Sequence, residues 1–224
     1  MQMIFLLTND DGINSPKLKY TKSILEKFGT VYLIAPNEEQ SAKSMSLTIG
    51  GFNFKKIDDF TYSIEGTPVD CVNFAFGALN LRPDIVFSGT NNGYNIGIDT
   101  RYSGTVGACL QAQYFGFSSV ALSCGKDESI ILEKELESVI KHILDNSLFS
   151  NQYTLNINFP NDKFGSSKGL LMTELDYYLF EYKPEIVGNK YKPNRRYIED
   201  KNIKENTDTY AYLNGYTSIS KIKV

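Results

Sequence analysis

Short apolar runs and amphipathic helical patterns alternate along the first 160 residues, and this alternation limits the fold more than any other feature. Met3–Thr8 and Val31–Ala35 are buried runs of strand length. Between them, Ser15 and Pro16 are typical of a helix start, and we expect Gly29 to end that helix. A strand, a helix and a second buried strand in this order predict a right-handed βαβ unit with parallel strands.

The same alternation continues as far as residue 159. Further strands are expected at Thr61–Glu65, Asp84–Ser88, Ser119–Ser123 and Tyr153–Phe159, and further helices start at Pro68, Thr105 and Ser129. The fold class that this predicts is α/β, with a doubly wound and mostly parallel sheet.

The pattern changes after Pro160. Tyr178, Phe180 and Tyr182 recur at every second position, which predicts a half-exposed hairpin strand. We interpret Lys183–Asn206 as an exposed excursion and Thr209–Lys223 as a return to β structure. Residues 1–160 are therefore expected to form an α/β catalytic core. Residues 161–224 are expected to form a C-terminal β-hairpin extension that mediates oligomer contacts.

Composition excludes several partners. The 224 residues carry a formal net charge of -3, so no basic excess indicates nucleic-acid binding. No apolar run is long enough to span a membrane, and the apolar stretch near the N-terminus is too short for a secretory signal. The three cysteines form no CxxC pair, which is typical of buried thiols in a reducing compartment. We expect a cytoplasmic protein.

The segment Thr8–Gly12 follows the first predicted strand directly and contains Asp10 and Asp11 side by side. Ligands of doubly wound sheets bind beyond the carboxyl ends of the strands. Two adjacent carboxylates in such a place repel each other, and a bound cation would relieve that repulsion. An Asp-Gly hairpin turn is the alternative, but the helical pattern after Ser15 argues against a hairpin.

Three more polar clusters occupy equivalent places after strands or at a helix start. They are Asn37, Gln40, Ser41, Ser44 and Ser46; then Asn91, Asn92 and Asn95; then Ser103, Gly104 and Thr105. Each cluster alone is ordinary loop or cap chemistry. The last opens a helix, and free N–H groups at a helix start bind anions. Because all four clusters belong to one edge of the predicted sheet, we expect them to converge.

The combined donor set is carboxylate, amide and hydroxyl oxygen, which suits Mg²⁺, Mn²⁺ or Ca²⁺ rather than Zn²⁺. The single histidine, His142, lies within the last helix, so no Ser-His-Asp triad can be assembled. Neither a Walker motif nor a Gly-x-Gly-x-x-Gly motif is present. A hard cation beside an anion site predicts phosphate-ester hydrolysis.

Two other interpretations stay open. A haloacid-dehalogenase-like phosphatase also places acid after the first strand, but it needs two aspartates separated by one residue, whereas Asp10 and Asp11 are adjacent. A non-catalytic nucleotide sensor would keep the pocket and bind nucleotide without turnover.

The sequence resembles the SurE family of 5′/3′-nucleotidases along nearly its whole length. The motifs that carry the resemblance are Leu6–Ile13, Ala35–Asn37 with Gln40-Ser41, Ser44–Thr48, Gly66–Val72, Pro83–Asn91, Tyr102–Ala108, Asn156–Pro160, Thr207-Asp208 and Gly215–Ile219. The resemblance implies a Rossmann-like core and a metal-dependent phosphatase acting on nucleoside monophosphates, with some activity on polyphosphate. It also implies a homodimer or homotetramer.

By motif, Asp10, Asp11, Ser41 and Asn91 match the family's ligands of one divalent metal ion, and Asn95, Ser103, Gly104 and Thr105 match its phosphate-binding residues. Asn9 of the first motif joins the expected substrate-binding residues. Asp10 and Asp11 are the expected catalytic residues, with Asp10 the one that orients or deprotonates the attacking water.

The chain departs from the family pattern at several positions. Lys17 stands where a glycine is common, Ala42 replaces a glycine, and Ile98 stands where an aspartate is frequent. Glu38 and Glu39 put acid where many members carry a basic residue near the substrate. The expected ligands all remain, so these changes concern substrate preference. The preferred base and the 5′ or 3′ position are not encoded in any motif that we identify.

Overall fold

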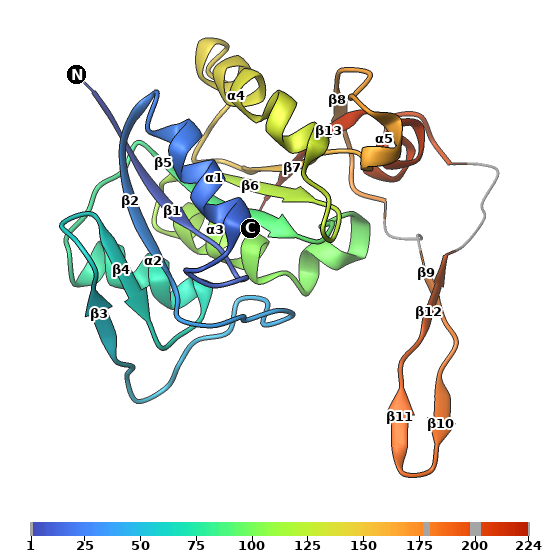
Figure 1. Cartoon of the computed structure of the whole chain (residues 1–224), viewed down its shortest axis with the longest axis horizontal. Helices are drawn as coiled ribbons and strands as arrows, with labels where there is room; N and C mark the ends of the chain where they lie inside the picture. The colour runs from blue at the N-terminus through green and yellow to red at the C-terminus, as the bar shows by residue number, and fades with distance from the viewer. Residues whose placement is uncertain (1, 177–179, 198–202, 224) are drawn as a thin grey trace.

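A nine-stranded sheet forms the centre of the molecule (Figure 1). The computed structural model describes residues 2–176, 180–197 and 203–223. The strands of the sheet, in spatial order, are β3 (Phe54–Lys56), β4 (Thr61–Ile64), β2 (Gly29–Pro36), β1 (Met3–Thr8), β5 (Ile85–Asn92), β6 (Ser118–Cys124), β7 (Thr154–Asn158), β13 (Thr217–Ile222) and β8 (Leu170–Thr173). The six strands from β4 to β7 in this order are parallel, while β3 and β13 run antiparallel to β4 and β7.

Helices cover both faces of this sheet. They are α1 (Pro16–Leu25), α2 (Pro68–Gly77), α3 (Gly104–Tyr114), α4 (Ile130–Asp145) and α5 (Asp208–Asn214), with short 3₁₀ turns at Gly97–Arg101 and Asp162–Phe164. One core cluster joins α1 and α4 to side chains such as Phe5 and Leu7, and a second joins α2 and α3 to Leu6. Successive β1 residues thus face opposite helix layers, as expected for a strand buried on both sides.

The chain order creates a switch point beside β1. From β1 the chain adds β2 and then β4 on one side, and after α2 it crosses to β5 on the other side. The loops after β1 and β5 therefore leave the sheet as neighbours, where doubly wound folds bind their ligands. The predicted α/β, doubly wound and mostly parallel fold is confirmed.

Two boundaries differ from the sequence prediction. The first helix ends at Leu25 rather than at Gly29, because Lys27 and Phe28 donate to carbonyls three residues back. Gly29 instead begins β2, and a Cβ atom there would lie 2.4 Å from the Met3 carbonyl oxygen. The glycine thus allows two strands to approach closely.

The glycine-rich segment and the C-terminal segment also differ. Strand β5 continues through Asn91 and Asn92 by pairing with β6 after a register shift. Thr209–Lys223 was expected to be β-like, but it begins inside α5, which Thr207 caps and which Gly215 ends in a left-handed conformation. The short edge strand β3 was not predicted at all.

A long two-part hairpin reaches away from the sheet (Figure 1). Its strands are β9 (Phe180–Tyr182) paired with β12 (Arg195–Tyr197), and β10 (Glu185–Val187) paired with β11 (Lys190–Lys192). The side chains from 183 to 194 are exposed, as predicted for an excursion. Tyr178, part of the predicted hairpin pattern, lies outside the described residues. None of the described helices is long and apolar enough to cross a membrane.

Candidate active site

The loops that leave β1, β2 and β5 meet the start of α3 around one cavity of about 370 Å³. Six of the predicted site residues line it: Asp10, Asp11, Ser41, Asn91, Asn95 and Ser103. They come from four separate stretches of the chain. The topology brings them together because each stretch lies at or just after the carboxyl end of a strand, or opens a helix, at the same edge of the sheet.

Asp10 lines this cavity and is buried, with 3% of its surface exposed. The Thr105 hydroxyl donates to Asp10 Oδ1 over 2.5 Å, and the Thr105 N–H donates to Oδ2 over 3.2 Å. Burial raises the pKa of Asp10 above its ordinary value, although these hydrogen bonds act in the opposite direction. The carboxylate is therefore oriented by α3 and holds a proton more readily than a solvated aspartate.

Asp11 lines the same cavity and is half-buried. The Asn92 N–H donates to its Oδ2 over 3.0 Å. Burial and the neighbouring charge of Asp10 raise the pKa of Asp11 to about 6, while the Asn92 N–H and the Lys17 ammonium act to lower it. Burial is the main cause at both carboxylates, and at Asp11 the charges of Asp10 and Glu39 add to it. A bound cation would favour the charged form of both groups.

The other two expected ligands present oxygen atoms of the right kind. The Asn91 side-chain nitrogen donates to the Gly93 carbonyl over 2.8 Å, so its side-chain oxygen is the atom left for a cation. The Ser41 hydroxyl donates to Glu39 over 2.6 Å and keeps its lone pairs. Within the described ranges, no three His, Cys, Asp or Glu side chains gather as a metal site. A cation here would therefore need the hydroxyl and amide oxygens, and the set fits a hard divalent ion.

The loop that carries Ser41 is fixed to its surroundings through backbone contacts. The Gln40 N–H donates to the Asp10 carbonyl over 2.7 Å, and the Ser44 hydroxyl donates to the Arg101 carbonyl over 2.7 Å. A Cβ atom at Gly107 would lie 2.4 Å from the Ser44 carbonyl oxygen, so the loop lies directly on α3. These contacts hold an otherwise exposed serine at the cavity although its loop has no regular structure.

Asn95 is buried and held by the two neighbouring strands. Its side-chain nitrogen donates to Ser123 over 2.8 Å, and its backbone carbonyl accepts from Asn156 and Asn158. Its backbone N–H donates to Asn158 Oδ1 over 2.8 Å. This network fixes Asn95 where it lines the cavity.

The remaining predicted residues do not line the cavity. Thr105 directs both of its donors at Asp10, so the N-terminus of α3 binds the protein's own carboxylate. Gly104 is packed against Asp10. Asn9 is fully buried, and its side-chain nitrogen donates to the Gly12 carbonyl over 3.1 Å. Direct phosphate contacts by Asn9, Gly104 and Thr105 stay predictions. In the structure, Gly104 and Thr105 contact Asp10, and Asn9 stabilises the turn that follows it.

The residues that line this cavity but were not among the expected site residues include Tyr94, Asp99, Tyr102 and Lys126. Lys126 lies in the polar loop after β6, whose carboxyl end points to the same edge as those of β1 and β5. The other clusters were identified as polar residues that follow parallel strands, and this loop has the same property. Asp99 lies in a 3₁₀ turn inside the glycine-rich segment, which carries no helical pattern in the sequence.

Asp208 ties the C-terminal helix α5 to the glycine-rich segment. Its carboxylate accepts hydrogen bonds from the backbone N–H groups of Gly97, Asp176 and Thr209 over 2.8, 2.9 and 2.9 Å. Burial nevertheless raises the pKa of Asp208 to about 6. The segment after Asn95 is thereby anchored to the far end of the chain.

We expect the metal-free protein to lose stability as the pH rises from about 4 to about 6. The pKa of Asp208 is higher in the folded state than its ordinary value of 3.8, so between these two values the folded state binds the proton that the unfolded chain releases. This difference between the two pKa values corresponds to about 3 kcal/mol of unfolding free energy. Asp11 contributes in the same direction and the same pH range.

Urea unfolding from pH 4 to pH 7 in the presence of a chelator measures this effect. The variant Asp208→Asn should show a clearly shallower decline, whereas Asp59→Asn, at an exposed aspartate, is the matched control and should follow the parent protein. An identical decline in Asp208→Asn and the parent would show that Asp208 does not titrate in this range.

Comparisons with known proteins agree with this architecture. The family described as Survival protein SurE matches residues 5–181. The 5′-nucleotidase SurE of Aquifex aeolicus (strain VF5) is 33% identical over 229 residues, which cover 97% of this chain and 91% of that protein. The 5′/3′-nucleotidase SurE of Wigglesworthia glossinidia brevipalpis is 35% identical over 231 residues, which cover 98% and 91%. The crystal structure of the SurE protein from Aquifex aeolicus superposes with a TM-score of 0.86 at 32% identity, covering 98% of this chain and 93% of that one.

Proposed function

The chain belongs to the SurE family and is a nucleotidase, and we propose that it hydrolyses nucleoside monophosphates to nucleoside and inorganic phosphate with one divalent metal ion. The observation that carries the metal dependence is the meeting of Asp10, Asp11, Ser41 and Asn91 in one cavity at the switch point of the sheet. We propose these four residues as the metal ligands and Mg²⁺ or Mn²⁺ as the ion, with Ca²⁺ as a third candidate.

Each residue then has a chemical task. When bound, the divalent ion polarises a phosphoryl oxygen and lowers the pKa of an adjacent water molecule. Asp10, oriented by Thr105 and with a raised pKa, accepts the proton of the attacking water or directs that water at phosphorus. Asn95 and Ser103 line the cavity as candidate donors to the phosphate oxygens. The water oxygen bonds to phosphorus, the ester bond breaks, and the leaving oxygen takes a proton.

Two further properties belong to this proposal. We propose that the hairpin of β9 to β12, whose residues 183–194 are exposed, takes part in a homodimer or homotetramer. We also propose a cytoplasmic location, supported by three buried free thiols at Cys71, Cys109 and Cys124.

Phosphate release from a substrate panel tests the function. We expect inorganic phosphate from 5′- or 3′-nucleoside monophosphates in the presence of Mg²⁺ or Mn²⁺, because the cavity supplies both the ion site and the base. Short polyphosphates belong in the same panel. Tight nucleotide binding without any phosphate release under Mg²⁺, Mn²⁺ and Ca²⁺ would instead support a nucleotide sensor. A trapped aspartyl-phosphate would support the dehalogenase-like mechanism.

A further inference from the structure

A second cavity of about 540 Å³ lies directly beside the candidate active site, between the N-terminal ends of α1 and α4. It shares Asp11, Glu39 and Asn92 with the first cavity, so the two are contiguous. Its volume is within the usual range for small-molecule sites. A substrate whose phosphate lies beside Asp10 and Asp11 can extend into it.

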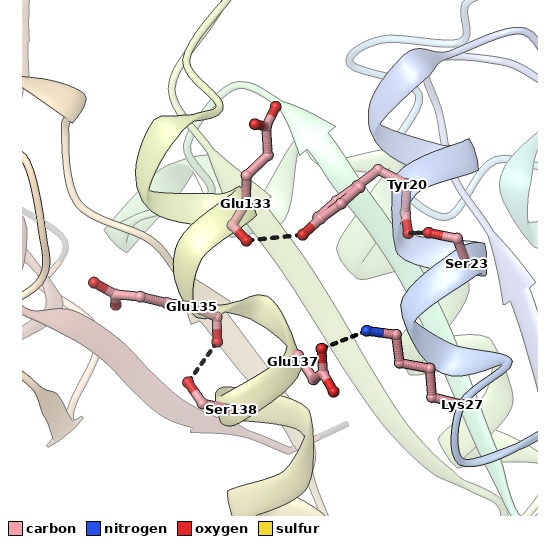
Figure 2. A network of polar contacts seen from close by, with 7 residues as sticks. All are labelled: Tyr20, Ser23, Lys27, Glu133, Glu135, Glu137 and Ser138. Carbon is pink, nitrogen blue, oxygen red and sulfur yellow. Dashed lines mark hydrogen bonds and ion pairs between the residues drawn. The ribbon is translucent and has the colours of Figure 1, made fainter.

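One wall of this second cavity is apolar and aromatic. It is built by Pro16 and Tyr20 of α1 and by Leu132 of α4. The Tyr20 hydroxyl donates to the Glu133 backbone carbonyl over 2.8 Å, which bridges the two helices and fixes the ring (Figure 2). A fixed aromatic ring with aliphatic neighbours provides a surface on which a flat, uncharged ring can pack.

The lining of this cavity is also acidic. Asp127 and Glu133 line the cavity together with Glu39, and all three are exposed. Among the described residues that line it, Lys17 is the only cationic one. Its ammonium donates to Asn92 Oδ1 over 2.7 Å and to the Gly125 carbonyl over 2.8 Å, and its charge acts on Asp11. Two neutral acceptors therefore hold the Lys17 ammonium in place, and the carboxylates that line the cavity outnumber this one cation.

We propose that this second cavity holds the nucleoside of a nucleoside monophosphate and disfavours the additional phosphates of a polyphosphate. This proposal rests on the nucleotidase function proposed above. It gives a binding site to the nucleoside, which is the leaving group of the hydrolysis. Ribose hydroxyls and exocyclic amines are neutral groups that can donate hydrogen bonds to the carboxylates of Asp127 and Glu133. The base can pack on the ring of Tyr20. Each extra phosphate of a polyphosphate would instead meet these like charges, whose repulsion is strong near a protein surface.

Removing the carboxylates of Asp127 and Glu133 tests the role of the acidic lining. We compare the double variant Asp127→Asn/Glu133→Gln with Glu137→Gln, which removes a charge one turn further along α4, where Glu137 pairs with Lys27 outside the cavity (Figure 2). Asn tolerates the positive φ of Asp127, so the loop should be retained. In the double variant, KM for adenosine monophosphate should rise about 5-fold at unchanged kcat. The kcat/KM for tripolyphosphate should rise at least about 3-fold, and this gain should shrink with added salt.

Filling the cavity tests the placement independently. Ser129 lines it and makes no side-chain hydrogen bond to α4, whose first N–H groups are bound by Asp162. The variant Ser129→Phe should therefore fold. It should lower kcat/KM for adenosine monophosphate about 10-fold or more and leave that for methyl phosphate, which has no nucleoside, within about 2-fold.

The outcomes separate this inference from the proposed function. Equal KM values for adenosine monophosphate in the parent, the double variant and Ser129→Phe would overturn the nucleoside site while leaving the nucleotidase function intact. Equal losses on adenosine monophosphate and methyl phosphate in a folded Ser129→Phe variant would also overturn it, because the substitution would then not act through the nucleoside. Absence of phosphate release by the parent protein from every substrate would overturn the proposed function itself.

Discussion

The variant Asp10→Asn should lower kcat/KM for nucleoside monophosphates by about 10²- to 10⁴-fold while the fold survives. The amide removes a proposed metal ligand and the proposed proton acceptor at once. Its geometry can still satisfy Thr105, because the amide oxygen can accept from the Thr105 N–H and the amide nitrogen can donate to the Thr105 hydroxyl.

The same variant should be at least as stable as the parent in the absence of metal. Burial raises the pKa of Asp10, which means that its charge costs folding free energy above that pKa. Steady-state kinetics and thermal unfolding in a chelator measure the two effects.

Asp70→Asn is the matched control: Asp70 is equally buried but caps α2, where it accepts from the Thr67 N–H over 2.9 Å. The Asp70→Asn variant should have a lower melting temperature than the parent and should keep the activity of the folded protein. A folded Asp10→Asn variant with full activity would refute the assignment of Asp10.

Removal of divalent cations by EDTA should reduce phosphate release to background, and added Mg²⁺ or Mn²⁺ should restore it. The donor set of two carboxylates, one hydroxyl and one amide oxygen binds such ions, and the repulsion between Asp10 and Asp11 makes binding favourable.

Thermal unfolding gives a second readout that does not depend on turnover. An ion at 100 times its dissociation constant stabilises the folded state by about 2.7 kcal/mol. For a chain of this length that corresponds to a rise of about 5–10 °C in Tm. Asp11→Asn should lose most of this rise, whereas Glu137→Gln should keep it. Full activity after exhaustive chelation would argue against a metal-dependent mechanism.

Local patterns predicted the elements of the core because each is decided by residues close in sequence. Strand β1 is an uninterrupted apolar run, and α1 starts at Ser15 and Pro16, as the cap and proline signals indicate. The errors fall where a distant partner decides. Strand β5 continues into its asparagines because β6 pairs with them, and Gly29 begins a strand because β1 lies against it.

The site shows the same division between local and distant causes. Asp10, Ser41 and Asn91 were recognised by type and by their position after strands, and the structure places them at one cavity. The sequence did not indicate which group the N-terminus of α3 binds in the folded protein. The helix start that predicted an anion site binds Asp10 itself through Thr105, a contact between residues 95 positions apart.

The sequence by itself determined the α/β class, the loops that carry oxygen ligands and the family to which the chain belongs. These follow from periodicity, capping and short motifs, which are written in neighbouring residues. Only the tertiary structure decided which donors point into the cavity, how burial raises the pKa of Asp11 to about 6, and that an acidic second cavity adjoins the first. Desolvation and the field of nearby charges depend on distances across the fold, and no run of neighbouring residues specifies those distances.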